Sequence, residues 1–197
     1  MLFTLISWAG LRVGETMGLD APLLRSLAYA TPRPPSMRAT LVRACAIGLA
    51  CGVLILAIDL AMRPWMPAPL STMPGSIARW KGFLASFYGG IGEEIQLRLF
   101  AMTLLAWAAW KILARRHPRL PPSAAWSAIV LAALAFGAAH LPAAARVFPL
   151  DAMVVFRTLV LNALGGLAFG WLFYRHGLEH AMAAHFSADI VVHVLAG

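Results

Sequence analysis

The sequence predicts an all-α fold, a multi-pass transmembrane helical bundle of about five or six membrane helices. Of the 197 residues, 61% are hydrophobic and only 12% are charged, and the mean hydropathy is +0.77. Soluble domains are about half apolar and about one quarter charged. A soluble fold of this length could not bury so much apolar surface, so lipid has to cover the excess. We therefore expect a multi-pass protein of the cell (inner) membrane.

Long apolar segments divide the chain, and each is compared with the roughly 20 apolar residues that a spanning helix needs. A proline-rich loop at 63–78 and basic breaks at 115–122 and 175–177 separate the segments. The N-terminal stretch is short for a span, so a truncated or interfacial helix is expected there. The expected helical segments are residues 2–13, 39–62, 80–113, 124–141, 151–174 and 177–196.

Single residues predict details of these helices. Ser123 is placed to cap the N-terminus of the helix that follows it, and Pro142 is placed to terminate that helix. Gly166 and Gly170 form a small-xxx-small step that favours close helix packing. Asp59 lies near the end of its span, where an acidic side chain can reach the membrane interface at low cost.

The net charge of +8 at pH 7 does not predict a nucleic-acid partner, because the basic residues stand singly or in small groups between apolar runs. Lys and Arg collect instead in the short cytoplasmic loops of membrane proteins. The arginine-containing loops at 14–38, 114–122 and 175–177 are therefore expected on one side of the membrane. Cys45 and Cys51 fall on different faces of one apolar segment, which predicts neither a disulfide nor a zinc cluster.

Charged groups deep in a bilayer cost at least about 2.5–3.5 kcal/mol each on insertion scales, so a structural or functional role is expected for each of them. Among the ionisable residues inside apolar segments of the stretch 80–197, six are singled out as candidate site residues, and we predict this stretch to be the functional core. Residues 1–79 are expected to form an N-terminal membrane and loop region without an assigned role. The six residues are Glu93, Glu94, Arg98, His140, His185 and Asp189.

The first cluster contains two adjacent acids. Glu94 and Arg98 are four residues apart with the acid first, which is the favourable order for a helical ion pair. Glu93 lies about 100° further around the helix and lacks that partner. The glycine-rich stretch 89–92 precedes them, so a bend or a close helix contact is expected. A carboxylate without a partner in a low-dielectric site is suited to act as a general base.

Histidines mark two further clusters. His140 ends an alanine-rich span, and taken alone it could simply be solvated at the interface. His185 and Asp189 share one helix face, and a structural hydrogen bond between helices is an equal alternative for that pair. Glu179 and His180, at the start of the same helix, are expected to be interfacial anchors.

The clusters together supply a free carboxylate, two imidazoles and a second acid from three helices. No other nucleophile is apparent, because Ser187 lacks a GxSxG context and the cysteines lack a basic neighbour. The sequence also lacks an HExxH zinc motif, a phosphate-binding loop and a dinucleotide fingerprint. Attack by water that a base activates is the chemistry these residues can perform.

This pattern resembles the CPBP family, the CAAX proteases and bacteriocin-processing intramembrane endopeptidases that are also called Abi proteins. The resemblance covers about residues 80–197 and keeps the family's order of motifs. The matched motifs are EExxxR at Glu93, Glu94 and Arg98, FxxxH at Phe136 and His140, and HxxxN or HxxxD at His185 and Asp189.

The resemblance implies a membrane-embedded peptidase in which Glu93 and His140 activate water while His185 and the residue at 189 stabilise the oxyanion. This mechanism requires no cofactor. Eukaryotic and archaeal relatives cleave a prenylated C-terminal CAAX peptide, and some bacterial relatives are linked to bacteriocin maturation or self-immunity. The implied partners are membrane lipid and a peptide or protein substrate that can be membrane-associated or prenylated.

Asp189 departs from the many relatives that have Asn at this position. An ionised carboxylate cannot donate a hydrogen bond to an oxyanion and would repel it. Asp189 is then protonated through burial, or it orients His185, or a cation lies near it. We expect Asp189 to act mainly by orienting His185.

Three alternatives stay open. In a zinc-dependent version of the same hydrolysis, Glu93, His140 and His185 hold one zinc ion beside the water. A non-catalytic membrane immunity or scaffold protein could instead keep the polar residues for helix association. A proton or ion transporter is the third alternative, and the absence of repeated halves in the sequence disfavours it.

Overall fold

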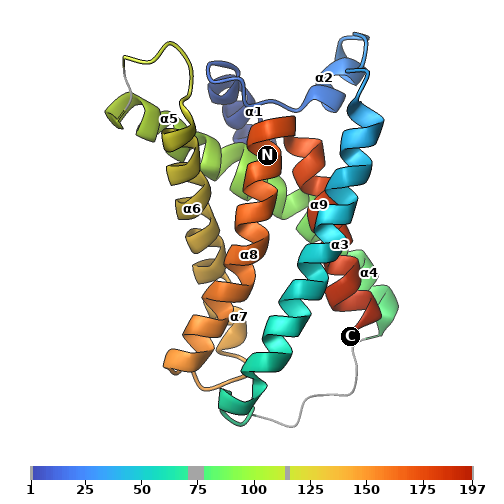
Figure 1. Cartoon of the computed structure of the whole chain (residues 1–197), viewed down its shortest axis with the longest axis vertical. Coiled ribbons are helices and arrows are strands. Elements are labelled where there is room, and N and C mark those ends of the chain that lie inside the picture. The colour runs from blue at the N-terminus through green and yellow to red at the C-terminus, as the bar shows by residue number, and fades with distance from the viewer. Residues whose placement is uncertain (1, 71–77, 114–115, 197) are drawn as a thin grey trace.

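The computed structural model of the chain describes residues 2–70, 78–113 and 116–196. Within these residues it contains helices and no strand, which confirms the all-α prediction. The described parts of the basic loops predicted to share one side lie together at the upper end of the bundle in Figure 1. Residues 71–77 of the predicted proline-rich loop and Arg115 lie outside the described residues.

The helices follow the predicted segments closely, with η1 a short 3-10 turn and η2, η3 and η4 of the π type. In chain order the elements are α1 (Leu2–Glu15), α2 (Pro22–Ala28), α3 (Met37–Met62), η1 (Arg63–Trp65), α4 (Arg79–Phe87), η2 (Tyr88–Glu93), η3 (Ile95–Met102), α5 (Thr103–Leu113), α6 (Pro122–Ala139), α7 (Leu141–Ala144), α8 (Ala152–His176), α9 (Leu178–Asp189) and η4 (Ile190–Leu195).

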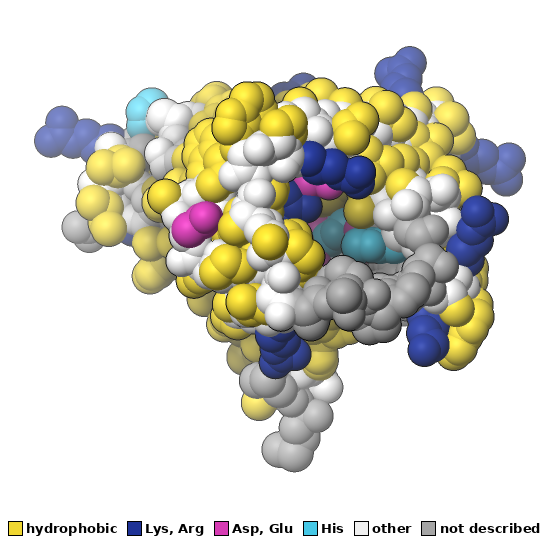
Figure 2. Space-filling view, turned by 90° about the horizontal axis from the view of Figure 1, so that it is seen from below, with side chains coloured by type: hydrophobic (Ala, Val, Ile, Leu, Met, Phe, Trp, Pro, Cys, Tyr) yellow, Lys and Arg dark blue, Asp and Glu magenta, His cyan; other side chains and the backbone are white. Residues whose placement is uncertain are grey.

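Four helices in the described part of the chain are long and apolar enough to cross a membrane: Met37–Trp65, Arg79–Leu113, Pro122–Ala144 and Ala152–His176. Large hydrophobic side chains stand on the outside of these helices, among them Val42, Ile112 and Phe156. Hydrophobic side chains also dominate much of the surface visible in Figure 2. Lipid contact accounts for this exposure, because monomeric soluble proteins rarely expose large apolar patches. The protein is a multi-pass membrane protein.

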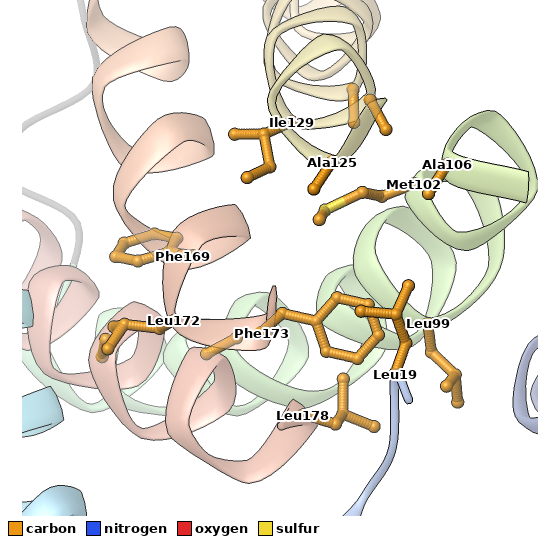
Figure 3. Close-up of a cluster of buried hydrophobic side chains, with 14 of the residues drawn as sticks. Leu19, Leu99, Met102, Ala106, Ala125, Ile129, Phe169, Leu172, Phe173 and Leu178 are labelled. Atoms are coloured by element: carbon orange, nitrogen blue, oxygen red, sulfur yellow. The ribbon is translucent and has the colours of Figure 1, made fainter. Parts of the chain in front are cut away.

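The core forms where α6, α8, α9 and the η3–α5 stretch meet. Met102, Ile129, Phe169 and Phe173 belong to one cluster of buried side chains in this region, which Figure 3 shows. Small residues allow the close packing of α8 on α6, since a Cβ added at Gly166 would lie 2.6 Å from the Cβ of Ala133. The small-xxx-small prediction for α8 is confirmed.

Helix capping differs from the prediction. The helix predicted at 124–141 begins at Pro122, and no side chain caps its N-terminus, so the prediction for Ser123 is wrong. Proline is already preorganised for a first helical turn, which allows the helix to begin before Ser123. Pro142 lies within the first turn of α7. The side-chain cap in this region is Asp151, whose Oδ1 accepts from Val154 N at 2.8 Å at the start of α8.

Two residues predicted as interfacial anchors are buried. Glu179 accepts a hydrogen bond from the backbone N–H of Leu24 at 2.8 Å, and His180 Nε2 is hydrogen-bonded to Thr40 Oγ1 at 2.9 Å. Leu24 belongs to α2, a helix that the sequence predicted only as part of a loop. The anchor prediction is wrong because α2 and α3 fold over the start of α9, which spacing within one helix does not reveal.

Asp59 also has a partner that the sequence did not indicate. Its Oδ1 accepts from Arg157 Nε at 2.6 Å, and the two side chains are 19% and 24% exposed. The pair therefore joins α3 to α8, and Asp59 does not simply extend to the membrane interface as predicted. Lipid would make each charge costly alone, and pairing lowers that cost.

Candidate active site

Irregular helical turns position the first cluster. Glu93 ends η2, Glu94 follows it, and Arg98 lies within η3. π turns are rare and are frequent at functional sites, because the extra residue per turn redirects the neighbouring side chains. The predicted irregularity at 89–92 is therefore present as a π turn, and η2 packs against α9.

One pocket of about 320 Å³ collects residues from all three clusters. Glu93, His140, His185 and Asp189 all line it, and α3 contributes Ile55 to its wall. Figure 2 shows a hollow in the lower face of the molecule with histidine side chains inside it and basic side chains nearby. Segments that are far apart in the sequence thus place their ionisable groups around one cavity.

Glu94 and Arg98 form the predicted ion pair behind this pocket. Glu94 Oε1 lies 3.1 Å from Arg98 Nη1, and the side chains are only 0% and 2% exposed. The guanidinium carbon of Arg98 lies 5.3 Å from the ring centroid of Phe136 and 5.7 Å from that of Phe169. Aromatic faces attract a cation, so they offset part of the cost of burying this guanidinium. The pair does not line the pocket itself, and Glu94 connects it to the pocket residue His185.

His185 is held in one orientation. Its Nδ1 lies 2.7 Å from Glu94 Oε1, and its ring stacks on Phe169 with centroids 4.7 Å apart. Asp189 Oδ1 lies 3.7 Å from His185 Nε2, which is too long for a hydrogen bond. The sequence assigned the orienting role to Asp189, and the structure gives it to Glu94. Only the packing of η2 on α9 brings Glu94 to this histidine.

Glu93 faces the pocket, as expected for the acid that lacks the arginine. Its side chain is 22% exposed, and Oε2 lies 3.9 Å from His185 Nε2. None of the hydrogen bonds among the described residues engages this carboxylate. Both of its oxygens are therefore free to accept a proton or a hydrogen bond from water.

His140 approaches the pocket from the end of α6. Its Nδ1 is hydrogen-bonded at 2.9 Å to the carbonyl oxygen of Phe136, and its ring packs edge-on against the Phe136 ring at 4.6 Å. A carbonyl oxygen only accepts, so Nδ1 carries the proton and Nε2 remains for other partners. His140 is thus a fixed pocket residue and not merely a solvated interfacial side chain.

Asp189 lies between two histidines. Its Oδ1 is 3.7 Å from His185 Nε2 and 3.8 Å from His193 Nε2, so the three residues share one helix face. Gly89 of η2 lies directly against this carboxylate. A Cβ at position 89 would collide with Asp189 Oδ2 and lie 3.3 Å from His185 Nε2. The absence of a side chain at Gly89 therefore admits Asp189 to the pocket.

A Gly89→Ala substitution is expected to lower activity strongly while the protein still folds. The added methyl group must displace Asp189 or move η2 away from α9, and small displacements of reacting groups cost about 100-fold in rate. Peptide cleavage and thermal unfolding in detergent measure the two effects separately. Gly18→Ala is not a suitable control, because Gly18 has a positive φ of 78°. Gly170→Ala is the better comparison, since its added Cβ meets only the side chains of Ile129 and Met102 and Gly170 does not line the pocket.

Sequence reasoning missed Asn162, Tyr88 and His193 as pocket residues. All three line the cavity, and Asn162 is the only asparagine of the chain. A side-chain amide in the middle of an apolar span is costly without hydrogen bonds, so its position in the sequence already carried a signal. Tyr88 and His193 carried no comparable signal, because each lies near a helix end or an interface.

The pocket carries the three side chains considered as zinc ligands, Glu93, His140 and His185. Within the described residues no group of three or more His, Cys, Asp or Glu side chains is placed to bind one ion together. His140 and His185 each have Nδ1 engaged with a protein oxygen, which leaves Nε2 of each ring as the nitrogen that can face an ion. We derive no step of the chemistry from this zinc site.

Comparison with known proteins assigns the family. The family model of Rce1-like type II CAAX prenyl endopeptidases matches residues 75–191, which is more than half of the chain. The chain belongs to this family. The family consists of CAAX endopeptidases, so the protein is a membrane protease that acts on a peptide or protein substrate. No curated protein and no solved structure matches the chain.

Proposed function

We propose that this protein is an intramembrane endopeptidase of the cell (inner) membrane that hydrolyses a peptide bond near the C-terminus of a membrane-associated, prenylated substrate. The observation that carries the proposal is the shared pocket of Glu93, His140 and His185, with an unengaged carboxylate beside two oriented imidazoles. The Rce1-like family match supports the CAAX type of substrate.

The proposed reaction begins with water between Glu93 and His140. Nε2 of His140 accepts a hydrogen bond from the water, and the Glu93 carboxylate removes a proton as the oxygen attacks the scissile carbonyl carbon. The carbonyl π electrons move to its oxygen, which becomes the oxyanion. As the C–N bond breaks, Glu93 returns the proton to the leaving amine, so carboxylate and histidine are regenerated.

His185 has a supporting role in this reaction. Its Nδ1–H is donated to Glu94, so its Nε2 carries a proton only in the imidazolium form. We propose that this imidazolium, paired with the buried Glu94, contributes to stabilising the oxyanion. Asp189 then balances the charge at the outer side of His185 and of His193.

The test uses purified full-length protein in detergent and a peptide that carries a farnesylated cysteine near a free C-terminus. Mass spectrometry of the products is expected to show cleavage directly after the modified cysteine. The Glu93→Gln protein supplies the baseline. Cleavage no faster than that baseline would reject the proposed function.

Metal dependence is tested in the same assay. The proposed water activation uses only protein side chains, so we expect the rate to persist after incubation with 1,10-phenanthroline and metal analysis to find less than one zinc per chain. A rate that falls with the chelator and returns on addition of zinc would favour the zinc-dependent alternative.

A further inference from the structure

Hydrogen-bond donors are scarce among the polar groups of the pocket. Glu93 and Asp189 are carboxylates that only accept when ionised. The Tyr88 hydroxyl lies on an exposed side chain and His193 is likewise exposed, so both belong to the outer edge of the cavity. An oxyanion formed deeper in the pocket needs donors that these four groups do not supply.

The two inner histidines supply at most one donor. Nδ1–H is already donated to the Phe136 carbonyl by His140 and to Glu94 by His185. In our proposal Nε2 of His140 accepts from water. Nε2 of His185 donates only when protonated, and it already faces Glu93 at 3.9 Å and Asp189 at 3.7 Å. Two carboxylates therefore compete with the oxyanion for this proton.

Asn162 has a donor that no protein group uses in the described part of the chain. Its Nδ2 donates to the carbonyl oxygen of Thr158 at 2.8 Å, one turn earlier on α8. Because that carbonyl only accepts, this bond fixes the amide with its nitrogen toward Thr158. The amide has two N–H groups, so one N–H remains for the cavity that Asn162 lines. This donor is independent of any protonation state.

The packing of α8 on α6 places Asn162 at the level of the proposed reaction. Gly166 lies against Ala133, and Gly137 lies against Leu159. Asn162 falls between these two contacts on α8, as Phe136 does on α6. It therefore lies level with Phe136, whose carbonyl holds His140.

We propose that Asn162 is a catalytic residue that donates its second amide N–H to the oxyanion. The inference rests on the proposed function. In the step, the C–O bond from water forms, the carbonyl π electrons move to oxygen, the proton goes to Glu93, and Asn162 changes no covalent bond. The residue thereby supplies the neutral donor that Asp189 cannot supply in its ionised form.

Replacing Asn162 by alanine tests the proposal with the farnesylated peptide. Loss of one oxyanion donor costs about 100- to 1,000-fold in kcat, whereas KM is expected to change little because the oxyanion exists only in the transition state. Gln96→Ala is the matched control. Gln96 has the chain's only other carboxamide-type side chain and also bonds the carbonyl four residues earlier, Gly92 O at 3.1 Å, but it does not line the pocket.

A rescue experiment separates a catalytic role from a structural one. Adding Asp189→Asn to Asn162→Ala gives the pocket a different neutral amide, and we expect part of the lost kcat to return. A purely structural asparagine would predict lower thermal stability and no rescue. Unchanged kcat in Asn162→Ala, or no recovery in the double variant, would overturn the inference. If the intact protein fails to exceed Glu93→Gln, the proposed function itself fails.

Discussion

Replacing Glu93 by glutamine is expected to reduce peptide cleavage by about 100- to 10,000-fold, the contribution typical of a general base. Glutamine has nearly the same shape and can still hydrogen-bond water, but it cannot remove the proton. The carboxylate lines the pocket and is 22% exposed, so its neutral replacement leaves no buried partner unpaired. The free energy of unfolding should therefore stay close to that of the unmodified protein.

The measurement combines initial rates with thermal unfolding in the same detergent. Glu15→Gln is the matched control, because Glu15 pairs with Arg25 at the protein surface and does not line the pocket. Exposed ion pairs contribute only about 0–1 kcal/mol, so this control should keep both activity and stability. If Glu93→Gln lost stability and retained the unmodified protein's rate, the residue would be a helix-association group, as the scaffold alternative requires.

Replacing Arg98 by methionine is expected to have the largest effect on stability. Breaking a buried ion pair by removing one partner costs about 3–5 kcal/mol, because the other charge stays buried without compensation. Glu94 is 0% exposed and would keep only its contact with His185. Activity should fall as well, since Glu94 holds the imidazole that faces the pocket. Chemical unfolding in mixed micelles measures the stability change.

Two comparison variants sharpen that result. Arg157→Met breaks the Asp59 pair, whose side chains are 24% and 19% exposed. Asp59 lies near the end of α3 and can turn toward the membrane interface when it loses its partner, so the stability loss should be smaller. Adding Glu94→Gln to Arg98→Met removes both buried charges and is expected to recover part of the stability but none of the activity. Equal losses of unfolding free energy in Arg98→Met and Arg157→Met would contradict the expectation that the deeper burial of the Glu94–Arg98 pair makes its loss more costly.

Much of the architecture was predictable because lipid imposes a strong rule on the sequence. A spanning segment must be long and apolar, and this requirement alone located the segments that became α3, the Arg79–Leu113 stretch, α6 and α8. Helix ends were less predictable, as Ser123 shows. Several residues can start a helix, and the choice among them depends on small energy differences that neighbouring packing decides.

The candidate site was predictable as a set of residues but not as a set of contacts. Glu94 and Arg98 pair as expected because their four-residue spacing already places them side by side on one helix. The bond between Glu94 and His185 joins residues 91 positions apart, and no local pattern indicates it. Asn162 could be recognised as a polar residue within an apolar span, but only the tertiary structure shows which cavity its helix lines.

The sequence by itself determined that the chain enters a membrane, which segments are helical, and which ionisable residues are too costly to lie there without a purpose. Those properties follow from local composition and helical spacing, and each depends only on residues within a single segment. Only the tertiary structure decided which carboxylate holds His185 and which residues surround the cavity, because these contacts arise from η2 packing against α9 across the absent side chain of Gly89.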